Sequence, residues 1–303
     1  MVPLAALAGA IWWSGRAAAD VPMPPPTKAH PPVKSEPPPI PSGPVAVTPP
    51  LLSYDLRVDI PVVVLGYVTW STLQALDDKL DPSHCHWCDD ELNAVDRETR
   101  NALKWPEEHQ ETALVLSDIT ANALAPAATV GVSATIAAYD DRFAEVPIDI
   151  VITGEAVALA GIATQIVKFS AGRMRPETRA LPPEERPSGE PNDAYVSFYS
   201  GHTSYAFSLA TSAGTIASMR RYRGAEWVWV SGLSVAAATG YLRIAADKHY
   251  LTDVLAAGAA GSTIGFLVPF VFHRPRQYLV PLRPGMTPLE DGALFTVDVD
   301  GML

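Results

Sequence analysis

The sequence predicts an all-α protein built as a six-helix bundle, and three observations support this fold class. From residue 51 onward, uncharged apolar windows alternate with shorter polar connections. These windows are rich in Ala and Leu and show little of the strict apolar–polar alternation of strands. Hydrophobic residues make up 48% of the chain, which is enough for a sizeable core. The predicted helices occupy 60–76, 119–139, 156–167, 203–219, 227–242 and 254–272, inside a helical domain over 51–276.

Two segments of unusual composition precede the predicted helices. Residues 2–13 are apolar and Ala17–Ala19 offers a cleavage site, so residues 1–19 are predicted to be a signal peptide, although no basic residue precedes Arg16. Residues 20–50 are dominated by proline and are predicted to be an extended, disordered linker, with an SH3-type ligand as the alternative. Residues 277–303 have no clear periodicity and are predicted to be a C-terminal tail.

The location of the bundle has two interpretations. A membrane-spanning helix needs ~20 apolar residues, and only the windows 119–139 and 254–272 come near that length. Basic residues at 220–223 and 273–276 lie at helix ends on the same predicted side, as the positive-inside rule requires. However, a cleaved signal would leave the N-terminus outside, which fits six spans poorly. We therefore favour a compact periplasmic domain lying against the membrane, with an integral membrane protein as the alternative.

The charge of the chain excludes one class of partner. The net charge is −11, and no stripe of basic residues runs along the chain. A nucleic-acid-binding surface needs such a stripe to neutralise phosphates. We therefore expect no nucleic-acid partner.

The two cysteines lie close together, in the sequence His84-Cys85-His86-Trp87-Cys88. In an oxidising compartment this spacing predicts a local disulfide between Cys85 and Cys88. A zinc site that uses a neighbouring histidine is one alternative, but a second pair of ligands is absent. A redox motif is the other alternative, and it lacks the βαβ context that such motifs have.

A first polar motif ends the predicted helix before residue 176. Lys168, Gly172 and Arg175 have the i, i+4, i+7 spacing of one helix face, and Pro176 predicts that the helix ends at Arg175. The two cations would then lie together at the C-terminal end of the helix. Cations at this end also interact favourably with the helix dipole, so ordinary helix-end charges are the alternative interpretation.

A second polar motif, Ser200-Gly201-His202, opens the apolar helix that begins near Thr203. Backbone N–H groups at a helix start are free to bind an anion, and Gly201 lets a ligand approach closely. His202 would project into the same site and could donate a proton. The alternative is a capping serine beside a structural histidine.

The third motif combines Arg243, His249 and Asp253. On a helix, Asp253 at i+4 could accept the imidazole N–H of His249 and leave the other ring nitrogen as a nucleophile. Arg243 could bind phosphate oxygens with two parallel hydrogen bonds. Asp247 and Lys248, between them, are predicted to form a solvated charge pair. A stabilising surface pair is the alternative interpretation of His249 and Asp253.

An antiparallel bundle would bring the three motifs together, because each falls at a helix end. The site would then contain three cations, two histidines and one carboxylate. This set is suited to holding a phosphate and attacking it without a metal.

The motifs resemble those of the type 2 phosphatidic acid phosphatase and vanadium haloperoxidase superfamily. That family carries K-x6-RP, then PSGH, then SR-x5-H-x3-D, and the matching segments here are 168–176, 199–202 and 242–253. Two positions depart from the pattern: Tyr199 replaces the family proline and Leu242 replaces the family serine. The resemblance extends the bundle expectation to a fold of the phosphatidic acid phosphatase/haloperoxidase type.

The resemblance also implies a role for each matching residue. His249 would attack phosphorus and become a phosphohistidine, Asp253 would orient it, and His202 would protonate the leaving oxygen. The phosphate would be bound by the remaining motif residues: Lys168, Arg175, Ser200, Gly201 and Arg243.

Three functions follow as hypotheses. The first is a metal-independent phosphatase, with no cofactor, that hydrolyses a phosphomonoester or pyrophosphate on a lipid or small molecule and whose active site faces outward. The second is a vanadium-dependent haloperoxidase, in which vanadate is the cofactor rather than only a phosphate mimic. The third is a non-catalytic anion-binding membrane protein. No oligomeric state is predicted.

Overall fold

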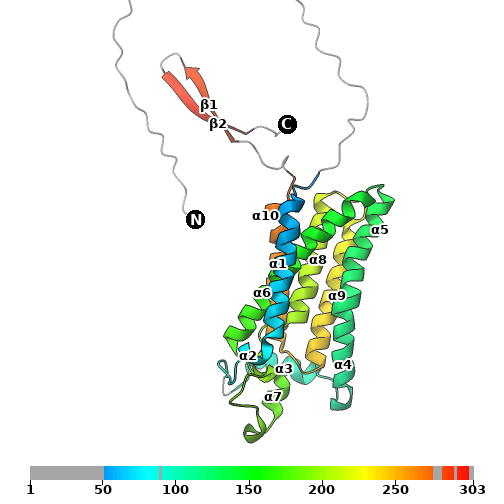
Figure 1. Ribbon diagram of the computed structural model, residues 1–303, viewed down its shortest axis with the longest axis vertical. Coiled ribbons are helices and arrows are strands. Elements are labelled where there is room, and N and C mark those ends of the chain that lie inside the picture. The colour runs from blue at the N-terminus through cyan, green and yellow to red at the C-terminus, as the bar shows by residue number, and fades with distance from the viewer. Residues whose placement is uncertain (1–50, 89–90, 276–281, 290–291, 300–303) are drawn as a thin grey trace, which may run out of the picture. The chain divides into compact units, whose positions relative to one another are not determined.

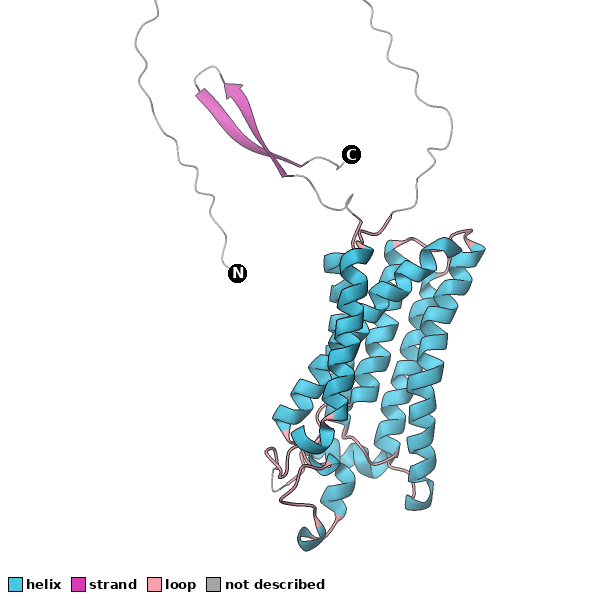
Figure 2. Cartoon of the chain, viewed as in Figure 1, coloured by secondary structure: helices cyan, strands magenta, loops and turns pink. Residues whose placement is uncertain are grey.

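The computed structural model describes residues 51–88, 91–275, 282–289 and 292–299 (Figure 1). The predicted signal peptide and proline-rich linker lie outside these residues. The helices of the described chain, shown in cyan in Figure 2, are α1 (Leu56–Ala75), α2 (Asp77–Leu80), α3 (Ala94–Leu103), α4 (Glu107–Ile119), α5 (Val132–Tyr139), α6 (Val146–Ala171), α7 (Pro176–Ala180), α8 (Gly201–Met219), α9 (Ala225–Ala245) and α10 (Leu251–Phe272).

Six long rods form the bundle among these helices, as predicted. Five of them are α1, α6, α8, α9 and α10. The sixth runs without a break from α4 to α5 through two π-helical turns, Thr120–Leu124 and Ala127–Gly131. Pro126 lies between these turns and lacks the N–H that a regular helix needs, so the hydrogen-bond pattern widens around it. The all-α prediction for residues 51–276 is therefore confirmed in the described part of that range.

The centre of the bundle is α8, which packs against α6, α9 and α10. Small residues let these helices approach closely. A Cβ atom added to Gly261 of α10 would lie 2.3 Å from the carbonyl oxygen of Ser204 in α8, so only glycine fits this contact. The close packing fixes the N-terminus of α8 relative to α10, and both contribute to the candidate site.

The membrane interpretation needs a correction. Among the described residues, five helical segments are long and apolar enough to cross a membrane: Leu56–Ala75, Glu107–Tyr139, Phe143–Ala171, Ala225–Ala245 and Leu251–Phe272. The apolar windows alone underestimated their length, because α4 begins with a polar turn and α6 carries Asp149 and Glu155 within its first half. In α1, large apolar side chains are 46–65% exposed, and a face of this kind is stable in lipid rather than in water; they include Val58, Ile60, Val62, Val64, Leu65 and Val68. The protein is an integral membrane protein, and the preference for a periplasmic domain was wrong.

The start of α1 and the end of α10 lie at the same end of the bundle (Figure 1). The backbone N–H of Ser53 donates to the carbonyl oxygen of His273 at 3.0 Å. The short helices α2, α3 and α7 lie at the other end (Figure 1). The bundle therefore has two distinct ends, and the three sequence motifs all map to the one with the short helices.

Part of the predicted C-terminal tail forms a two-stranded antiparallel hairpin. Strand β1 (Leu282–Leu289) pairs with β2 (Gly292–Val299) in a register that runs from Leu282 opposite Val299 to Leu289 opposite Gly292. Pro284 and Pro288 in β1 argue against a strand in a sequence-based reading, because proline cannot donate to a ladder. A strand with only one partner tolerates them where the missing N–H does not face that partner.

Candidate active site

The segment from Lys168 to Arg175 differs from the predicted continuous helix. Helix α6 ends at Ala171 because Gly172 adopts a left-handed conformation with φ of 55°, which glycine accommodates readily. A Cβ at Gly172 would also lie 2.6 Å from Nδ1 of His86. Arg175 then lies in extended backbone as the N-cap of α7, and Pro176 is the first residue of that helix. The predicted shared helix face was therefore wrong, since glycine and not proline ends α6.

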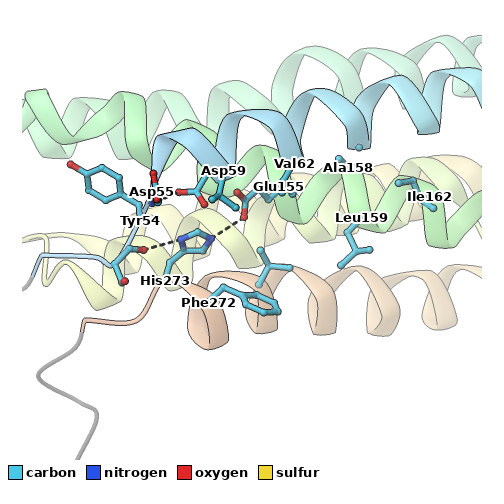
Figure 3. A pocket seen from close by; sticks show the side chains of 14 residues that line it. Tyr54, Asp55, Asp59, Val62, Glu155, Ala158, Leu159, Ile162, Phe272 and His273 are labelled. Carbon is cyan, nitrogen blue, oxygen red and sulfur yellow. Dashed lines mark hydrogen bonds and ion pairs between the residues drawn. The ribbon is translucent and has the colours of Figure 1, made fainter.

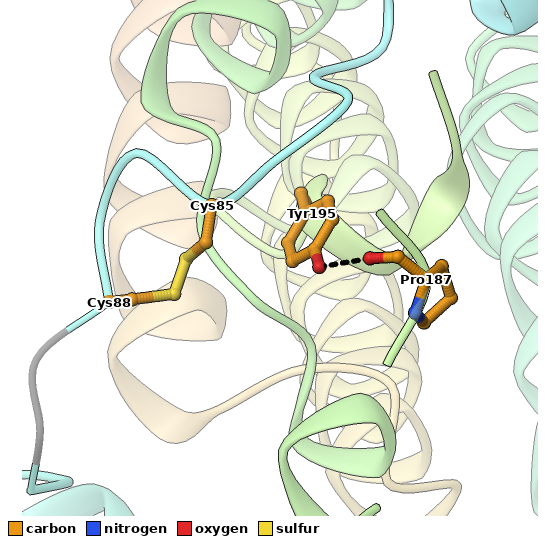
Figure 4. Close-up of a disulfide and its surroundings, with 4 residues drawn as sticks. All are labelled: Cys85, Cys88, Pro187 and Tyr195. Carbon is orange, nitrogen blue, oxygen red and sulfur yellow. Dashed lines mark hydrogen bonds between the residues drawn. A yellow bond between two sulfur atoms is a disulfide. The ribbon is translucent and has the colours of Figure 1, made fainter. Parts of the chain in front are cut away.

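The disulfide loop supports this turn from outside. Cys85 and Cys88 are bonded to each other (Figure 4), as predicted. The backbone N–H of His86, inside the loop, donates to the carbonyl oxygen of Gly172 at 3.0 Å. The loop therefore holds the chain where it leaves α6 and enters the site.

The second motif begins α8 as the sequence predicted. Ser200 is the N-cap and is fully buried, and Gly201 is the first helical residue. The hydroxyl of Thr203 donates to Oγ of Ser200 at 2.9 Å, which leaves the Ser200 proton available to another acceptor. A Cβ at Gly201 would lie 3.7 Å from Nζ of Lys168. The ammonium group at the end of α6 thus lies beside the N–H groups at the start of α8.

The imidazole of His249 is held differently from the prediction. Its Nδ1 lies 2.7 Å from the carbonyl oxygen of Ser197, to which it donates, but 3.8 Å from Oδ2 of Asp253. The carboxylate instead accepts from the hydroxyl of Ser197 at 2.6 Å and from the backbone N–H of Tyr250 at 2.9 Å. The tautomer is nevertheless the expected one, because a proton on Nδ1 leaves the Nε2 lone pair free. Asp253 therefore positions His249 through Ser197 rather than by a direct bond.

Arg173 is a central residue of the site that sequence analysis missed. Its guanidinium donates to Asp253 and, at 2.7 Å, to Asp96 of α3. It also lies between the rings of Trp87 and Tyr250, 4.7 and 4.4 Å from their centroids. Burial alone would raise the pKa of Asp96, but the hydrogen bonds that it accepts hold this pKa below its ordinary value. The sequence contains Arg173 as a further cation between Lys168 and Pro176, but Arg173 is not a position of the motif.

The other two arginines are buried in the site and differ in how fully they are bonded. Arg175 donates to the carbonyl oxygens of Asp193 at 2.7 Å and Lys248 at 3.2 Å. Arg243 donates to the hydroxyl of Ser117 at 3.2 Å, while its Nε has no partner among the described residues. A buried guanidinium with an unused N–H is available to bind an anionic ligand.

Asp118 of α4 is the second residue of the site that sequence analysis did not assign. One of its carboxylate oxygens lies 3.0 Å from Nε2 of His202 and 3.8 Å from Arg243. Burial, followed by the charges of Arg243, Lys168 and Arg175, lowers the pKa of His202 to about 3, whereas the Asp118 carboxylate acts in the opposite direction and favours the protonated imidazole. Helix α4 precedes the motifs by fifty residues, so no local spacing connects Asp118 with His202.

The electrostatics of His249 favour its neutral form. The side chain is only 1% exposed. Burial, followed by the charges of Arg175, Arg243 and Lys168, holds the pKa of His249 well below its usual value of 6.5. A neutral imidazole keeps the lone pair that a nucleophile needs.

Asp247 and Lys248 do not form the predicted charge pair. Asp247 is buried and receives two hydrogen bonds of 2.6 Å from Arg100, whereas Lys248 pairs with Glu177 at 2.6 Å. The ion pairs Arg100–Asp247 and Lys248–Glu177 hold the chain before His249 against α3 and α7.

The two positions that depart from the sequence pattern are buried. Leu242 belongs to an apolar cluster with Ala113, Ala245 and Ala246. Tyr199 is 5% exposed and packs edge-on against Phe198.

A pocket of about 130 Å³ opens beside the motif residues. Lys168, Gly201 and His202 line its inner side, and Trp70 of α1 and Tyr205 of α8 line its apolar side. A phosphate bound between the cations could therefore extend its substituent into this space.

The comparisons with known proteins concern the same part of the chain. Residues 149–277 match the family described as the PAP2 superfamily, and this range contains all eight residues proposed for the site. A lipid A 1-phosphatase of Porphyromonas gingivalis is 30% identical over 126 residues, which cover 40% of this chain and 24% of that protein. The chain thus matches about a quarter of that relative's length. A crystal structure of a transmembrane PAP2 type phosphatidylglycerolphosphate phosphatase from Bacillus subtilis aligns over 70% of this chain and 94% of its own, with 15% identity and a TM-score of 0.40.

Proposed function

Because residues 149–277 match the PAP2 superfamily, we propose that the chain is a membrane phosphatase of this type that removes a phosphate group from a lipid through a phosphohistidine intermediate. The observation that carries this proposal is the free Nε2 of His249 beside three cations, Lys168, Arg175 and Arg243. The match to the PAP2 superfamily and the similarity to a lipid A 1-phosphatase support the reaction class.

Substrate binding rests on the cations and the start of α8. Lys168 and Arg243 bind the phosphate oxygens, together with the hydroxyl of Ser200 and the N–H of Gly201. Their positive charge offsets the negative charge of the transition state, so the proposal requires no divalent metal. The unused N–H of Arg243 is satisfied when the phosphate binds.

The first chemical step forms a nitrogen–phosphorus bond. The Nε2 lone pair of His249 attacks phosphorus, and the bond from phosphorus to the leaving oxygen breaks. His202 gives its proton to that oxygen, so the alcohol leaves neutral. In the second step His202 accepts a proton from water, the water oxygen attacks phosphorus, and inorganic phosphate is released from His249.

The lipid class of the substrate is supported by the surroundings of the site. The 130 Å³ pocket beside Lys168 and His202 is bounded by Trp70 and Tyr205. Trp70 belongs to α1, whose apolar side chains are largely exposed. A phosphorylated headgroup can enter there while its acyl chains remain in the membrane.

An outward orientation of the active site is also part of the proposal. The Cys85–Cys88 disulfide supports it, since its loop contacts Gly172 at the active-site end of the bundle. Disulfides persist in oxidising compartments such as the periplasm.

The test is phosphate release by the purified full chain in detergent. Phosphatidic acid, a lipid-linked pyrophosphate and p-nitrophenyl phosphate are compared in excess EDTA. We expect turnover of a lipid substrate, and a loss of at least about 10³-fold in His249→Ala, as is typical when a nucleophile is removed. His84→Ala is the matched control, because His84 contacts Ser83 outside the site.

Three outcomes would contradict the proposal. Full activity in His249→Ala would exclude this nucleophile, and loss of activity in EDTA that added metal restores would exclude metal independence. Halide oxidation after loading with vanadate, without phosphate release, would instead favour a haloperoxidase.

A further inference from the structure

Three titratable groups that the active site does not use, two of them buried and one half-buried, lie together at the opposite end of the bundle (Figure 3). They are Asp59 of α1, Glu155 of α6 and His273, which follows α10. Their ligand atoms lie within 4.8 Å of one another. We propose that they form a binding site for a divalent metal ion and that the ion is Zn²⁺.

The two carboxylates lack sufficient positive charge around them. Glu155 contacts His273 at 2.8 Å through Oε2, and Asp59 accepts only the backbone N–H of Asp55 at 2.8 Å. No Lys or Arg pairs with either carboxylate within the described part of the chain. Even a protonated His273 would leave a net charge of −1 in a buried site, which is costly unless a cation binds.

Glu155 provides an independent sign of a missing ligand. Its side chain is 9% exposed, and Oε1 is buried with no hydrogen-bond partner in the described structure. Figure 3 shows this carboxylate beside Asp59 and His273. Buried polar atoms are almost always bonded, so an orphaned carboxylate oxygen beside two other ligand groups indicates an absent partner.

His273 is already oriented as a metal ligand would be, although Nε2, now 2.8 Å from Oε2 of Glu155, must give up its proton when the metal binds. Its Nδ1 lies 3.0 Å from the carbonyl oxygen of Ser53, to which it donates. Metal-binding histidines usually donate their second ring N–H to a carbonyl or carboxylate, which fixes the ring and leaves the other nitrogen for the metal. Here that nitrogen is Nε2, the atom directed at Glu155.

The ligand set favours Zn²⁺ over Mg²⁺ or Ca²⁺. One imidazole nitrogen and two carboxylate oxygens match zinc, whereas the harder ions prefer six or more oxygens. Ligands on a tetrahedral zinc lie about 3.3 Å apart, given bonds of about 2.0 Å. Separations of up to 4.8 Å in this cluster must therefore shorten, and the 2.8 Å contact between His273 and Glu155 must lengthen slightly. The fourth position faces an adjoining pocket of about 560 Å³, where water can complete the shell.

A metal here would cross-link three rods where the chain enters and leaves the bundle. Helix α1 packs mainly on α6, and many of its apolar side chains are exposed. The metal would add a bond between α1, α6 and the end of α10. Its role would be to stabilise this end of the bundle rather than to take part in phosphate hydrolysis.

The test uses the full chain in detergent, stripped of metal with EDTA, dialysed and titrated with ZnCl₂. We expect one Zn²⁺ per chain and a rise in thermal midpoint on loading. Glu155→Gln and Asp59→Asn keep the side-chain sizes and should bind Zn²⁺ at least tenfold more weakly. Asp55→Asn is the matched control, because Asp55 lines the same pocket but caps α1, a role that Asn also fills.

A second control removes the other histidine pair. His84 and His86 lie 4.9 Å apart by ring centroids and could bind zinc at the surface. The double variant His84→Gln/His86→Gln should therefore bind Zn²⁺ like the wild type. Visible absorption of Co²⁺ bound to the wild-type chain gives a readout that needs no variant to fold, and it should show a four-coordinate nitrogen–oxygen site.

Two results would overturn the proposal. One is a wild-type chain that takes up no Zn²⁺ or Co²⁺ at micromolar concentration, which would leave His273 and Glu155 as an ordinary ion pair. The other is binding that persists in Glu155→Gln and Asp59→Asn but disappears in His84→Gln/His86→Gln. Phosphatase turnover is not a readout here, so failure of this proposal is distinguishable from failure of the proposed function.

Discussion

Replacing Arg173 with methionine should be among the most destabilising changes at the active-site end. Arg173 is the cation shared by Asp96 and Asp253, whose side chains are both fully buried. Methionine has a similar length and keeps contact with the rings of Trp87 and Tyr250, so the change removes charge more than volume. Both carboxylates would then be left in the interior without this partner.

The expected magnitude follows from that burial. Removing one partner of a buried ion pair costs about 3–5 kcal/mol, because the remaining charge is uncompensated. Loss of the cation from between two aromatic rings adds about 1 kcal/mol. Asp96 keeps bonds from Thr252 and Asn93, and Asp253 keeps those from Ser197 and Tyr250, which limit the effect. We therefore expect a loss of about 4 kcal/mol, a large part of the 5–15 kcal/mol typical of folded proteins.

The assay is unfolding of the purified chain in mixed micelles, followed by near-UV circular dichroism. Arg97→Met is the matched control, since Arg97 pairs with Glu98 at 3.4 Å on the surface, with side-chain exposures of 50% and 72%. Such a pair contributes about 0–1 kcal/mol. If Arg173→Met destabilises the protein no more than Arg97→Met does, the charge network does not hold this end of the bundle.

Two further predictions concern the histidines. Burial and the neighbouring cations lower the pKa of His202, and the Asp118 carboxylate, 3.0 Å from Nε2, offsets part of that effect. Asp118→Asn should therefore lower kcat about tenfold with an alkyl phosphate but little with p-nitrophenyl phosphate, whose leaving group needs no proton; an equal loss with both substrates would contradict this role. The pKa of His249 is lower in the folded than in the unfolded chain, so the unfolded chain binds the proton more readily. The free energy of unfolding should therefore fall as the pH drops below about 6.5, by up to ~1.4 kcal/mol per pH unit. Unfolding midpoints measured from pH 8 to 5 should decrease less steeply in His249→Gln, and identical slopes would count against a buried neutral imidazole.

The sequence was sufficient for the features that depend on local pattern. Long apolar windows identified six rods, because lipid-facing and core-facing helices are apolar over most of their length. The start of α8 at Ser200-Gly201 followed from the Ser-Gly pair before an apolar run, and the close spacing of the two cysteines indicated their pairing. Each of these inferences needs only a few neighbouring residues.

The features that the sequence did not predict depend on contacts between distant segments. Asp118 meets His202 across 84 positions of the chain, and Arg173 meets Asp96 across 77. The end of α6 was misplaced because two helix-stop signals compete there, and the left-handed Gly172 acts four residues before Pro176. Residue spacing alone does not show which of the two signals ends the helix, because that depends on which residues pack against the turn.

The separation of His249 from Asp253 shows how one spacing can serve two purposes. Tyr250 is the N-cap of α10 and Asp253 is its third helical residue, so the carboxylate turns back to accept the backbone N–H of Tyr250. That bond is half of a capping box, and it draws Asp253 away from the imidazole to 3.8 Å. The same carboxylate holds the hydroxyl of Ser197, whose carbonyl oxygen orients His249. Asp253 therefore serves first to cap the start of α10. It also positions His249, the proposed nucleophile, through Ser197, whose hydroxyl it binds.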